Sequence, residues 1–247
     1  MSEIAAALTL VGMPDPADAC DAAQWPATHG ALPPDLGSLG LEQSARRGDP
    51  LPRPRSEPGL RLVTRGILCL THAGTGLCTA IIGQGAPAGP AGGLWMTDGA
   101  FVDVGFETLR QHYGGPTALA VWMQAAELSR AAVEAELVCF VRHPASRRFA
   151  RWMLALMKDA DTTVITQTEL ARLGGLQRTS VSASMTTLQL RGALKVMRGR
   201  IAVQDRAALE REACGCGAPL ALAAETGESP PDGASIGSAD GTLRFAG

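Results

Sequence analysis

The polar side chains between residues 166 and 186 have the types and spacing that suit contact with nucleic acid. Arg178, Thr179, Ser182, Ala183 and Thr186 recur at positions that one face of a helix presents. This face is basic or small and hydrogen-bonding, and it carries no carboxylate that would repel phosphate. A helix that enters the major groove of DNA requires such a face. The alternative interpretation is an ordinary helical hairpin within a core.

A first short helix is predicted to lead into this face. Thr166 followed three residues later by Glu169 is a capping box, in which each side chain accepts a hydrogen bond from an unpaired amide at a helix start. The helix therefore begins near Gln167. It ends at Gly174 and Gly175, because glycine adopts the positive φ that a tight turn needs.

A second helix is predicted over residues 177–189. Its apolar residues Val181, Met185 and Leu188 recur at steps of four and three, which places them on one face of a helix. That face can pack inward while the polar face stays exposed. The two helices with their glycine turn therefore resemble a helix-turn-helix unit in shape.

A basic β-hairpin is expected after the second helix. Strands at 194–197 and 201–203 flank Arg198 and Arg200, and a last helix from Arg206 closes the domain. Two helices followed by a hairpin form a winged helix-turn-helix, whose hairpin tip can touch phosphates; a solvated turn is the alternative. The predicted DNA contacts are Thr166, Gln167, Thr168, Gln177, Arg178, Thr179, Ser180, Ser182, Ala183, Thr186, Arg198 and Arg200.

One further helix precedes this unit. His143 and Pro144 break the preceding helix, and Ser146 can cap the next one. Residues 159–163 read as a polar connector. The apolar residues predicted on one face of this helix are Phe149, Trp152, Met153 and Leu156.

The charge of the chain is concentrated in the same segment. Residues 142–211 carry 13 Lys/Arg and 5 Asp/Glu, a balance of +8, whereas residues 1–141 carry 8 and 14, a balance of −6. The remaining residues carry 1 and 5, a balance of −4, so the net charge of −2 hides one basic segment. This is the electrostatic pattern of a phosphate-binding module inside an acidic chain.

Composition and length indicate a soluble protein with room for two domains. The chain has 247 residues, 46% of them hydrophobic and 19% charged. No apolar run reaches the roughly 18 residues of a membrane span, and the N-terminus has no basic segment of a signal peptide. We therefore expect a cytoplasmic protein with no membrane partner.

The region from Leu60 to Ile82 has a β-like pattern of branched residues. A tight hairpin is expected at Arg65 and Gly66, a glycine-rich loop over residues 83–93, and one more strand over 101–106. These runs predict a small antiparallel β-roll or barrel. Residues before 58 read as loops and short helices, with a weak helical pattern at residues 4–10.

A long helix is predicted over residues 117–142, with Pro116 at its start. About 25 residues span ~38 Å, which is too long for one small β domain to cover. Its apolar stripe suggests a partner helix from a second copy of the chain, and a core helix packed wholly within its own domain is the alternative. The predicted dimerisation residues are Leu119, Trp122, Met123, Ala126, Val133, Leu137 and Phe140.

The chain resembles the Crp/Fnr family of bacterial transcription regulators. The resemblance is carried by HPASRRFARWML from His143, ITQTELARLGGLQRTSVS from Ile165, LQLRGAL from Leu188, and RGRIAVQDRAALEREACGC from Arg198. It is strong over residues 136–216, and it looks like the branch whose recognition helix starts Arg-Thr-Ser-Val. The preceding long helix resembles the family's dimer helix, and the β region loosely resembles its cupin-like sensor roll.

The resemblance implies a homodimer that binds a two-fold symmetric operator, with RNA polymerase as its partner. By position, Arg178 looks like the arginine that reads a base, suited to guanine O6 and N7. Thr179 and Ala183 depart from the Glu and Arg of the best-known members, so their operators do not transfer. Gly174 and Ser184 stand where related units often carry larger apolar side chains, and both are expected to thin the core.

The sensor region departs further from the family. Nothing in residues 83–106 reproduces the Gly-Glu and Arg-Thr/Ser pairs of nucleotide-binding members, and no Lys or Arg lies between Arg65 and Arg110. A cyclic nucleotide would lack a cationic partner, so we predict no cAMP binding. Haem ligation by His72 or His112 stays open, although a lone histidine is more often structural. The effector is unknown.

The cysteines predict neither a metal site nor a cofactor. Six cysteines show no CxxC pair and no metal-ligand spacing with histidine, which suggests scattered reduced thiols. The iron-sulphur variant of the family needs closely spaced N-terminal cysteines, and Cys20 stands alone. Cys214 and Cys216 are interpreted as a structural helix end rather than a redox sensor, because no nearby basic partner besides Arg211 would stabilise a thiolate.

These observations predict an α+β protein that is not an enzyme. The chain has no phosphate-cradling glycine motif before a helix and no nucleophile elbow. A second alternative is a constitutive DNA-binding or scaffold dimer whose sensor region has decayed. The predicted domains are an irregular segment at 1–58, a degenerate cyclic-nucleotide-binding-like roll at 59–115, a dimerisation helix at 116–142, a winged helix-turn-helix at 143–216 and a disordered acidic tail at 217–247.

Overall fold

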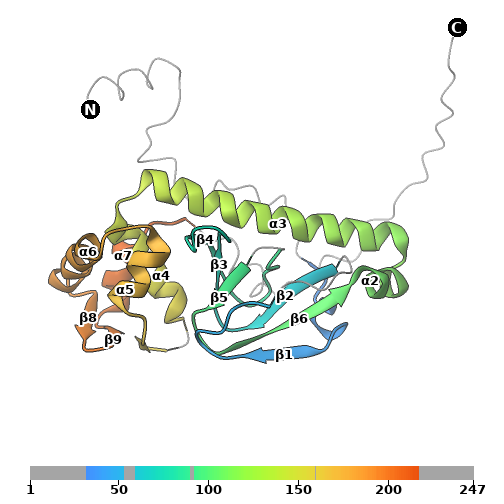
Figure 1. Ribbon diagram of the computed structural model, residues 1–247, viewed down its shortest axis with the longest axis horizontal. Coiled ribbons are helices and arrows are strands. Elements are labelled where there is room, and N and C mark those ends of the chain that lie inside the picture. Colours follow the sequence, from blue (N-terminus) through green and yellow to red (C-terminus); the bar gives the residue numbers. More distant parts are fainter. Residues whose placement is uncertain (1–31, 53–58, 90–91, 159, 217–247) are drawn as a thin grey trace, which may run out of the picture.

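The computed structural model describes residues 32–52, 59–89, 92–158 and 160–216, and two three-stranded antiparallel sheets form its N-terminal half (Figure 1). Buried side chains from both sheets, among them Val63, Leu68, Trp95 and Phe101, fill the space between them. The sheets therefore form a β-roll. The first sheet has the order β1-β6-β2 and the second β4-β3-β5, with β1 Glu42–Ala45, β2 Gly59–Arg65, β3 Leu68–Thr71, β4 Cys78–Ile82, β5 Gly92–Trp95 and β6 Gly99–Gly105.

The pairing of the strands differs from the sequence prediction in two places. β2 and β3 belong to different sheets, so Arg65 and Gly66 do not close a hairpin; Gly66, with φ of +83°, turns the chain from one sheet to the other. β5 begins inside the predicted glycine loop. A Cβ on Gly93 would lie 3.1 Å from Leu68 Cδ1 and 3.2 Å from the Cys69 carbonyl oxygen, so glycine lets β5 lie close against β3.

Two short elements of this half were not predicted. β1 lies in the segment expected to be irregular and pairs with β6, with Glu42 opposite Val102. The strand expected over 101–106 is confirmed as β6, but Phe106 begins a helix instead, α2 Phe106–Tyr113. A short 3-10 helix, η2 Leu36–Ser38, precedes β1. The helical pattern near residues 4–10 and the acidic tail lie outside the described residues.

The predicted long helix is confirmed as α3, Gly115–Arg142, with Pro116 in its first turn. Its 28 residues span about 42 Å and run along both halves of the molecule (Figure 1). One face is buried and is made largely of small residues, including Ala118, Ala125 and Ala132. These let the helix lie close to the roll.

The C-terminal half is the winged helix-turn-helix that the sequence predicts. The helix with Phe149, Trp152, Met153 and Leu156 on its buried face is α4. Its N-cap is Pro144 rather than Ser146, and no side chain caps it. The elements are α4 Ala145–Leu156, β7 Thr162–Thr163, α5 Gln167–Gly174, α6 Arg178–Leu190, β8 Leu194–Met197, β9 Arg200–Val203 and α7 Arg206–Glu212.

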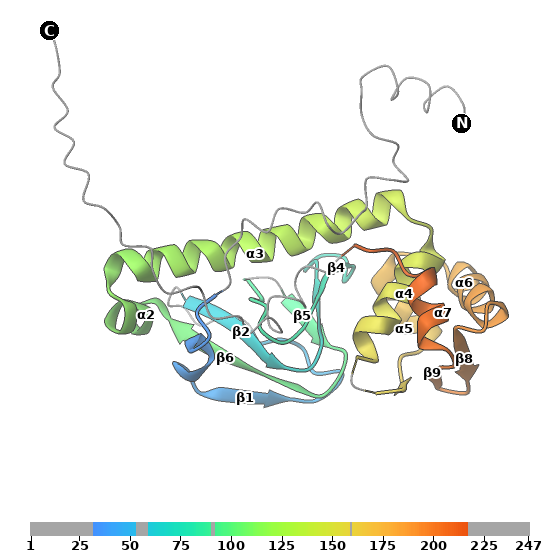
Figure 2. The same ribbon diagram turned by 180° about the vertical axis from the view of Figure 1, so that it is seen from behind.

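The segment predicted to be a polar connector contains a strand. Thr163 of β7 pairs with Ile201 of β9, so the wing is a three-stranded sheet of order β7-β9-β8. The wing therefore contains β7, which precedes α5, as well as β8 and β9, which follow α6. Figure 2 shows α7 beneath the C-terminal end of α3.

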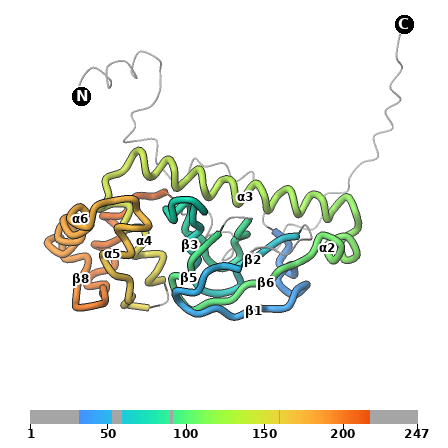
Figure 3. The backbone as a smooth tube through the Cα atoms, in the orientation of Figure 1, coloured from blue at the N-terminus to red at the C-terminus, as the bar shows by residue number. Residues whose placement is uncertain are grey.

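One of the hydrophobic clusters spans both halves. Cys69 and Met96 of the roll pack in the same cluster as Phe149 and Leu170 of the C-terminal half. The turn between β3 and β4 also reaches the turn between α5 and α6, where a Cβ on Gly175 would lie 2.9 Å from a methyl carbon of Leu77. Figure 3 shows the C-terminal half lying directly beside the β3–β4 end of the roll. The two halves therefore pack directly against each other.

No helix in the described part of the chain is long and apolar enough to cross a membrane.

Candidate nucleic-acid interface

The capping box at the start of α5 is present as predicted. The Thr166 hydroxyl accepts a hydrogen bond from the Glu169 amide at 3.1 Å, and Glu169 Oε2 accepts from the Thr166 amide at 2.8 Å. The helix ends at Gly175, which is left-handed with φ of +61°. The cap and the glycine together fix where the next helix begins.

α6 has one buried and one exposed face, and the division follows the predicted periodicity. Val181, Met185 and Leu188 are buried, together with Ser184. Of the predicted DNA contacts, Gln167 is half-buried. The others lie at the exposed surface, namely Thr166, Thr168, Gln177, Arg178, Thr179, Ser180, Ser182, Ala183, Thr186, Arg198 and Arg200.

The two positions expected to thin the core are both filled. The ring of Phe149 lies 3.4 Å from where a Cβ of Gly174 would stand, so an aromatic ring occupies the space of the missing side chain. The Ser184 hydroxyl donates a hydrogen bond to the Ser180 carbonyl at 2.9 Å, which satisfies its buried oxygen. The packing of α4 therefore compensates for the small residue at 174.

A groove joins the starts of both helices to the wing. It has a volume of about 440 Å³ and opens between α5, α6 and the β8–β9 hairpin. Of the predicted contacts it brings together Thr166, Gln167, Thr168, Arg178 and Arg200, whereas the remaining seven lie outside it. The apolar residues that line this groove were not predicted from the sequence. They are Ile165, Val196, Met197 and Ile201, together with Gly199.

The arginines of this surface are available to an anionic partner. Within the described residues, Arg178, Arg198 and Arg200 form no ion pair with a carboxylate, whereas Arg191 is held by Glu212 at 2.7 Å. Arg178 and Arg200 line the same groove from two elements. Exposed arginines on two neighbouring elements suit an extended anion such as a phosphate backbone.

The capping glutamate also ties the roll to α5. Arg47, which follows β1, donates a hydrogen bond from Nη2 to Glu169 Oε1 at 2.8 Å. Partial burial raises the pKa of Glu169, but the hydrogen bonds from Thr166 and the charge of Arg47 outweigh it and hold the pKa below its ordinary value of 4.5. Glu169 is therefore ionised at neutral pH.

Replacing Glu169 by alanine should lower the free energy of unfolding by about 1 kcal/mol, because the capping box is lost. Glu169→Gln is the matched control, since glutamine keeps an acceptor for the Thr166 amide but lacks the charge that pairs with Arg47. The pKa of Glu169 is lower in the folded protein than its ordinary value of 4.5. The charge of Glu169 therefore adds to the free energy of unfolding at pH values above 4.5, and this contribution is lost as the pH falls through the folded-state pKa. Urea unfolding over a series of pH values from about 7 downward measures both; a wild-type advantage over Glu169→Gln that does not shrink as the pH falls below 4.5 would contradict the assignment.

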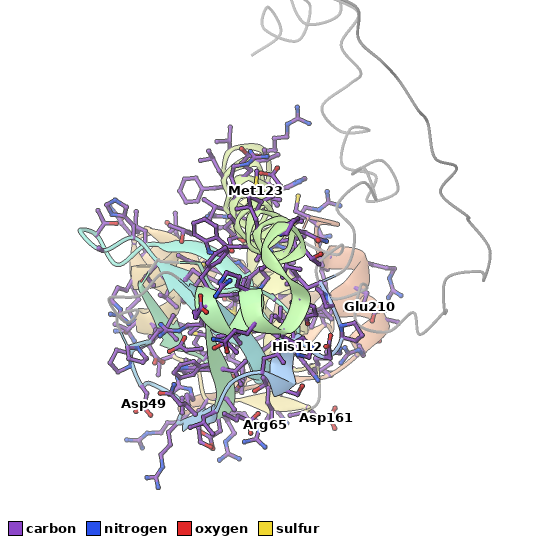
Figure 4. All side chains as sticks on the ribbon, turned by 90° about the vertical axis from the view of Figure 1, so that its right-hand side faces the viewer. Asp49, Arg65, His112, Met123, Asp161 and Glu210 are labelled. Carbon is purple, nitrogen blue, oxygen red and sulfur yellow. The ribbon has the colours of Figure 1, made fainter. Side chains whose placement is uncertain are left out.

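The predicted dimerisation stripe is exposed along α3. All seven residues are solvent-exposed, with Met123 at 62% and Leu137 at 61%, and Val138 and Val141 extend the stripe. Figure 4 shows Met123 on the side of α3 that faces away from the roll. Trp122 contacts the Phe106 ring and Arg148 lies over the Phe140 ring, but the described part of the chain leaves most of the stripe uncovered. This contradicts the alternative of a helix packed wholly within its own domain.

Within the described residues, the interior of the roll offers little to a cyclic phosphate. Trp95 and Phe101 are buried and stacked, with ring centroids 6.2 Å apart. The buried guanidinium of Arg61 is already paired with Asp103, at 2.6 Å from Nε to Oδ1. His72 and His112 lie at the surface, hydrogen-bonded to Thr75 and Asp35 respectively.

Three of the cysteines lie close together, contrary to the interpretation of scattered thiols. The sulphur atoms of Cys139, Cys214 and Cys216 all lie within 4.8 Å of one another. Hydrogen bonds from the Cys139 and Cys216 thiols, helped by the charge of Arg151, lower the pKa of Cys214. The prediction that only Arg211 could stabilise a thiolate was therefore wrong, because α4 brings a second arginine across from a distant part of the sequence.

This architecture, a β-roll joined through a long helix to a winged helix-turn-helix, is known from other proteins. Residues 147–212 match the family model described as the Crp-like helix-turn-helix domain. No curated protein matches the sequence.

The solved structures that share the fold include the following three. A CRP/FNR-family transcriptional regulator from Thermus thermophilus is 18% identical, with a TM-score of 0.54 over 70% of this chain and 98% of that one. FixK2 from Bradyrhizobium japonicum is also 18% identical, with a TM-score of 0.51 over 70% and 97%. A CRP-family regulator, also from Thermus thermophilus, is 19% identical, with a TM-score of 0.52 over 69% and 96%. The chain therefore has the α+β fold of Crp/Fnr-type regulators.

Proposed function

We propose that this protein is a transcriptional regulator of the Crp/Fnr type that binds a specific DNA sequence as a homodimer. The observation that carries the proposal is the exposed face of α6, whose Arg178 shares a groove with Arg200 of the wing. Residues 178–181 read Arg-Thr-Ser-Val, which supports the branch of the family with that recognition helix. Cytoplasmic location and RNA polymerase as the downstream partner follow from this function.

In this proposal α6 enters the major groove and the wing touches the backbone. Arg178 reads guanine, while Thr179, Ser180, Ser182, Ala183 and Thr186 approach neighbouring base edges or phosphates. The N-terminus of α5, with Thr166 and Thr168, approaches a phosphate. No bond is made or broken, so the protein acts by binding rather than by catalysis.

The exposed stripe on α3 supports the proposal that a second subunit packs against this helix. Two parallel stripes packed together would remove large apolar side chains of both chains from water, which supplies the driving force for association. A two-fold dimer would present two copies of α6 to a two-fold symmetric operator. The pose of the two copies then depends on how each C-terminal half docks on its roll.

Fluorescence anisotropy with a labelled mixed-sequence duplex tests DNA binding itself. The affinity should fall steeply as salt rises, because each phosphate contact releases a counterion. Binding that is absent at low salt, or that does not respond to salt, would contradict the proposal.

Calorimetric titration with cAMP should show no binding, because buried Arg61 is already paired with Asp103 and buried Trp95 packs in the core between the two sheets. The same preparation must bind duplex DNA, which shows that it is folded. A dissociation constant in the micromolar range or tighter would overturn this prediction.

The filled interior of the roll also favours a second candidate, a constitutive DNA-binding or scaffold dimer that answers to no small molecule. A thermal-shift screen against metabolites and haem separates the two. A true effector raises the melting temperature by mass action, whereas a constitutive dimer responds to none.

A further inference from the structure

We propose that Cys139, Cys214 and Cys216 form a binding site for a thiophilic divalent metal ion, Zn²⁺. The three residues come from two elements that are far apart in sequence. Cys139 lies in the last turn of α3, and the other two follow α7 at the end of the C-terminal half. This site goes beyond the proposed function, since neither the recognition helix nor the dimer stripe uses these residues.

The geometry of the sulphur atoms fits a single ion. The sulphur atoms of Cys139 and Cys214 are 3.4 Å apart, and all three sulphurs lie within 4.8 Å of one another. Zinc bonds to thiolate at about 2.3 Å, so sulphurs around one tetrahedral ion stand somewhat under about 4 Å apart. Small side-chain rotations are enough to bring the three sulphurs to that spacing.

Burial gives the site both rigidity and an entrance. Cys139 and Cys214 are buried, and Cys216 is half-buried. An ion can therefore enter past Cys216 and keep a fourth position for water or another ligand, as zinc sites with three protein ligands do. Two of the three ligands are fixed by packing before the ion arrives, which lowers the entropy cost of binding.

The charges around the cluster favour a divalent ion. Arg151 is paired with Glu136, whose carboxylate also accepts a hydrogen bond from Trp152 Nε1 at 3.1 Å. Arg148 is only 3% exposed and lies over the Phe140 ring, and within the described residues its Nε and Nη1 find no hydrogen-bond partner. Three thiolates and one divalent ion leave a single negative charge, which the Arg148 guanidinium can balance.

Binding would release the thiol protons and join two parts of the molecule. Each cysteine sulphur that binds the ion as a thiolate gives up its proton to solvent, with no change in oxidation state. The ion would then hold the end of the C-terminal half to the end of α3. Because that junction sets the pose of α6 relative to the dimer helix, metal binding is placed to influence DNA binding.

Titration of the reduced, full-length protein with Co²⁺ without oxygen, followed by displacement with Zn²⁺, tests the site. We expect one ion per chain, intense thiolate-to-cobalt charge-transfer absorption, and loss of that absorption when Zn²⁺ is added. Absence of the charge-transfer band in reduced protein would overturn the proposal. The readout needs no DNA, so its failure would leave the proposed DNA-binding function standing.

Matched cysteine variants identify the ligands. Cys216→Ser should weaken Co²⁺ affinity on the order of 100-fold or more, by removing a ligand that is not needed for core packing; Cys139→Ser should do the same. Cys78→Ser is the control, because Cys78 is also half-buried but lies outside the cluster. Unchanged affinity in Cys216→Ser, or an equal loss in Cys78→Ser, would contradict the assignment.

Discussion

Replacing Leu137 by glutamate should convert the protein from a dimer to single chains. Leu137 is 61% exposed on α3 and stands within the apolar stripe that the proposed dimer buries. Losing one buried leucine from each of two chains costs about 3–6 kcal/mol, and the two carboxylates add repulsion. The dissociation constant of the dimer should rise on the order of 100-fold or more. Sedimentation equilibrium of wild type and variant measures this.

The control for this experiment is another exposed leucine. Leu41 is 87% exposed but precedes β1, away from α3, so Leu41→Glu should stay dimeric. Leu137→Glu should also lose most of its affinity for a two-fold operator, because each half-site is then bound independently. A variant that remains a dimer with unchanged unfolding would show that a different surface joins the subunits.

Replacing Arg178 by alanine should lower affinity for the preferred operator by about 1–3 kcal/mol, or roughly 5- to 150-fold. The reason is the loss of two hydrogen bonds to one guanine, which other DNA sequences do not offer. The affinity for random DNA should fall much less. Anisotropy titrations on the operator and on a scrambled duplex give both values.

Arg200→Ala is the matched control, because Arg200 lines the same groove from the wing. Its loss should weaken binding to both duplexes by a similar factor and reduce the slope against salt by about one, as expected of a phosphate contact. Equal losses on both duplexes for Arg178→Ala would show that Arg178 positions the protein rather than reading a base.

The helix-turn-helix could be predicted from the sequence because its signals are local. A capping box joins residues three apart, and the buried face of α6 repeats every three or four residues. The wing follows directly, with Met197 opposite Arg200 across a two-residue turn. Each of these features is decided by neighbours along the chain, so periodicity and turn chemistry were sufficient.

The roll and the cysteine cluster depend instead on contacts between distant residues. Local pattern did not show that β2 pairs with β6 rather than with β3, nor that a strand begins at Gly92. Cys139 and Cys214 are 75 residues apart, and Arg47 and Glu169 are 122 apart. The spacing of residues along the chain does not predict such contacts, because they depend on how the two halves pack against α3.

Selection of duplexes from a random pool by the purified full-length protein tests the central claim most directly. We predict enrichment of a two-fold symmetric sequence whose half-sites are centred about one helical turn, or a multiple of it, apart. Repeating the selection with Arg178→Ala should relax the preference at one guanine of each half-site. Enrichment of no sequence, or of a site without symmetry, would contradict the account of a dimer that reads DNA through α6.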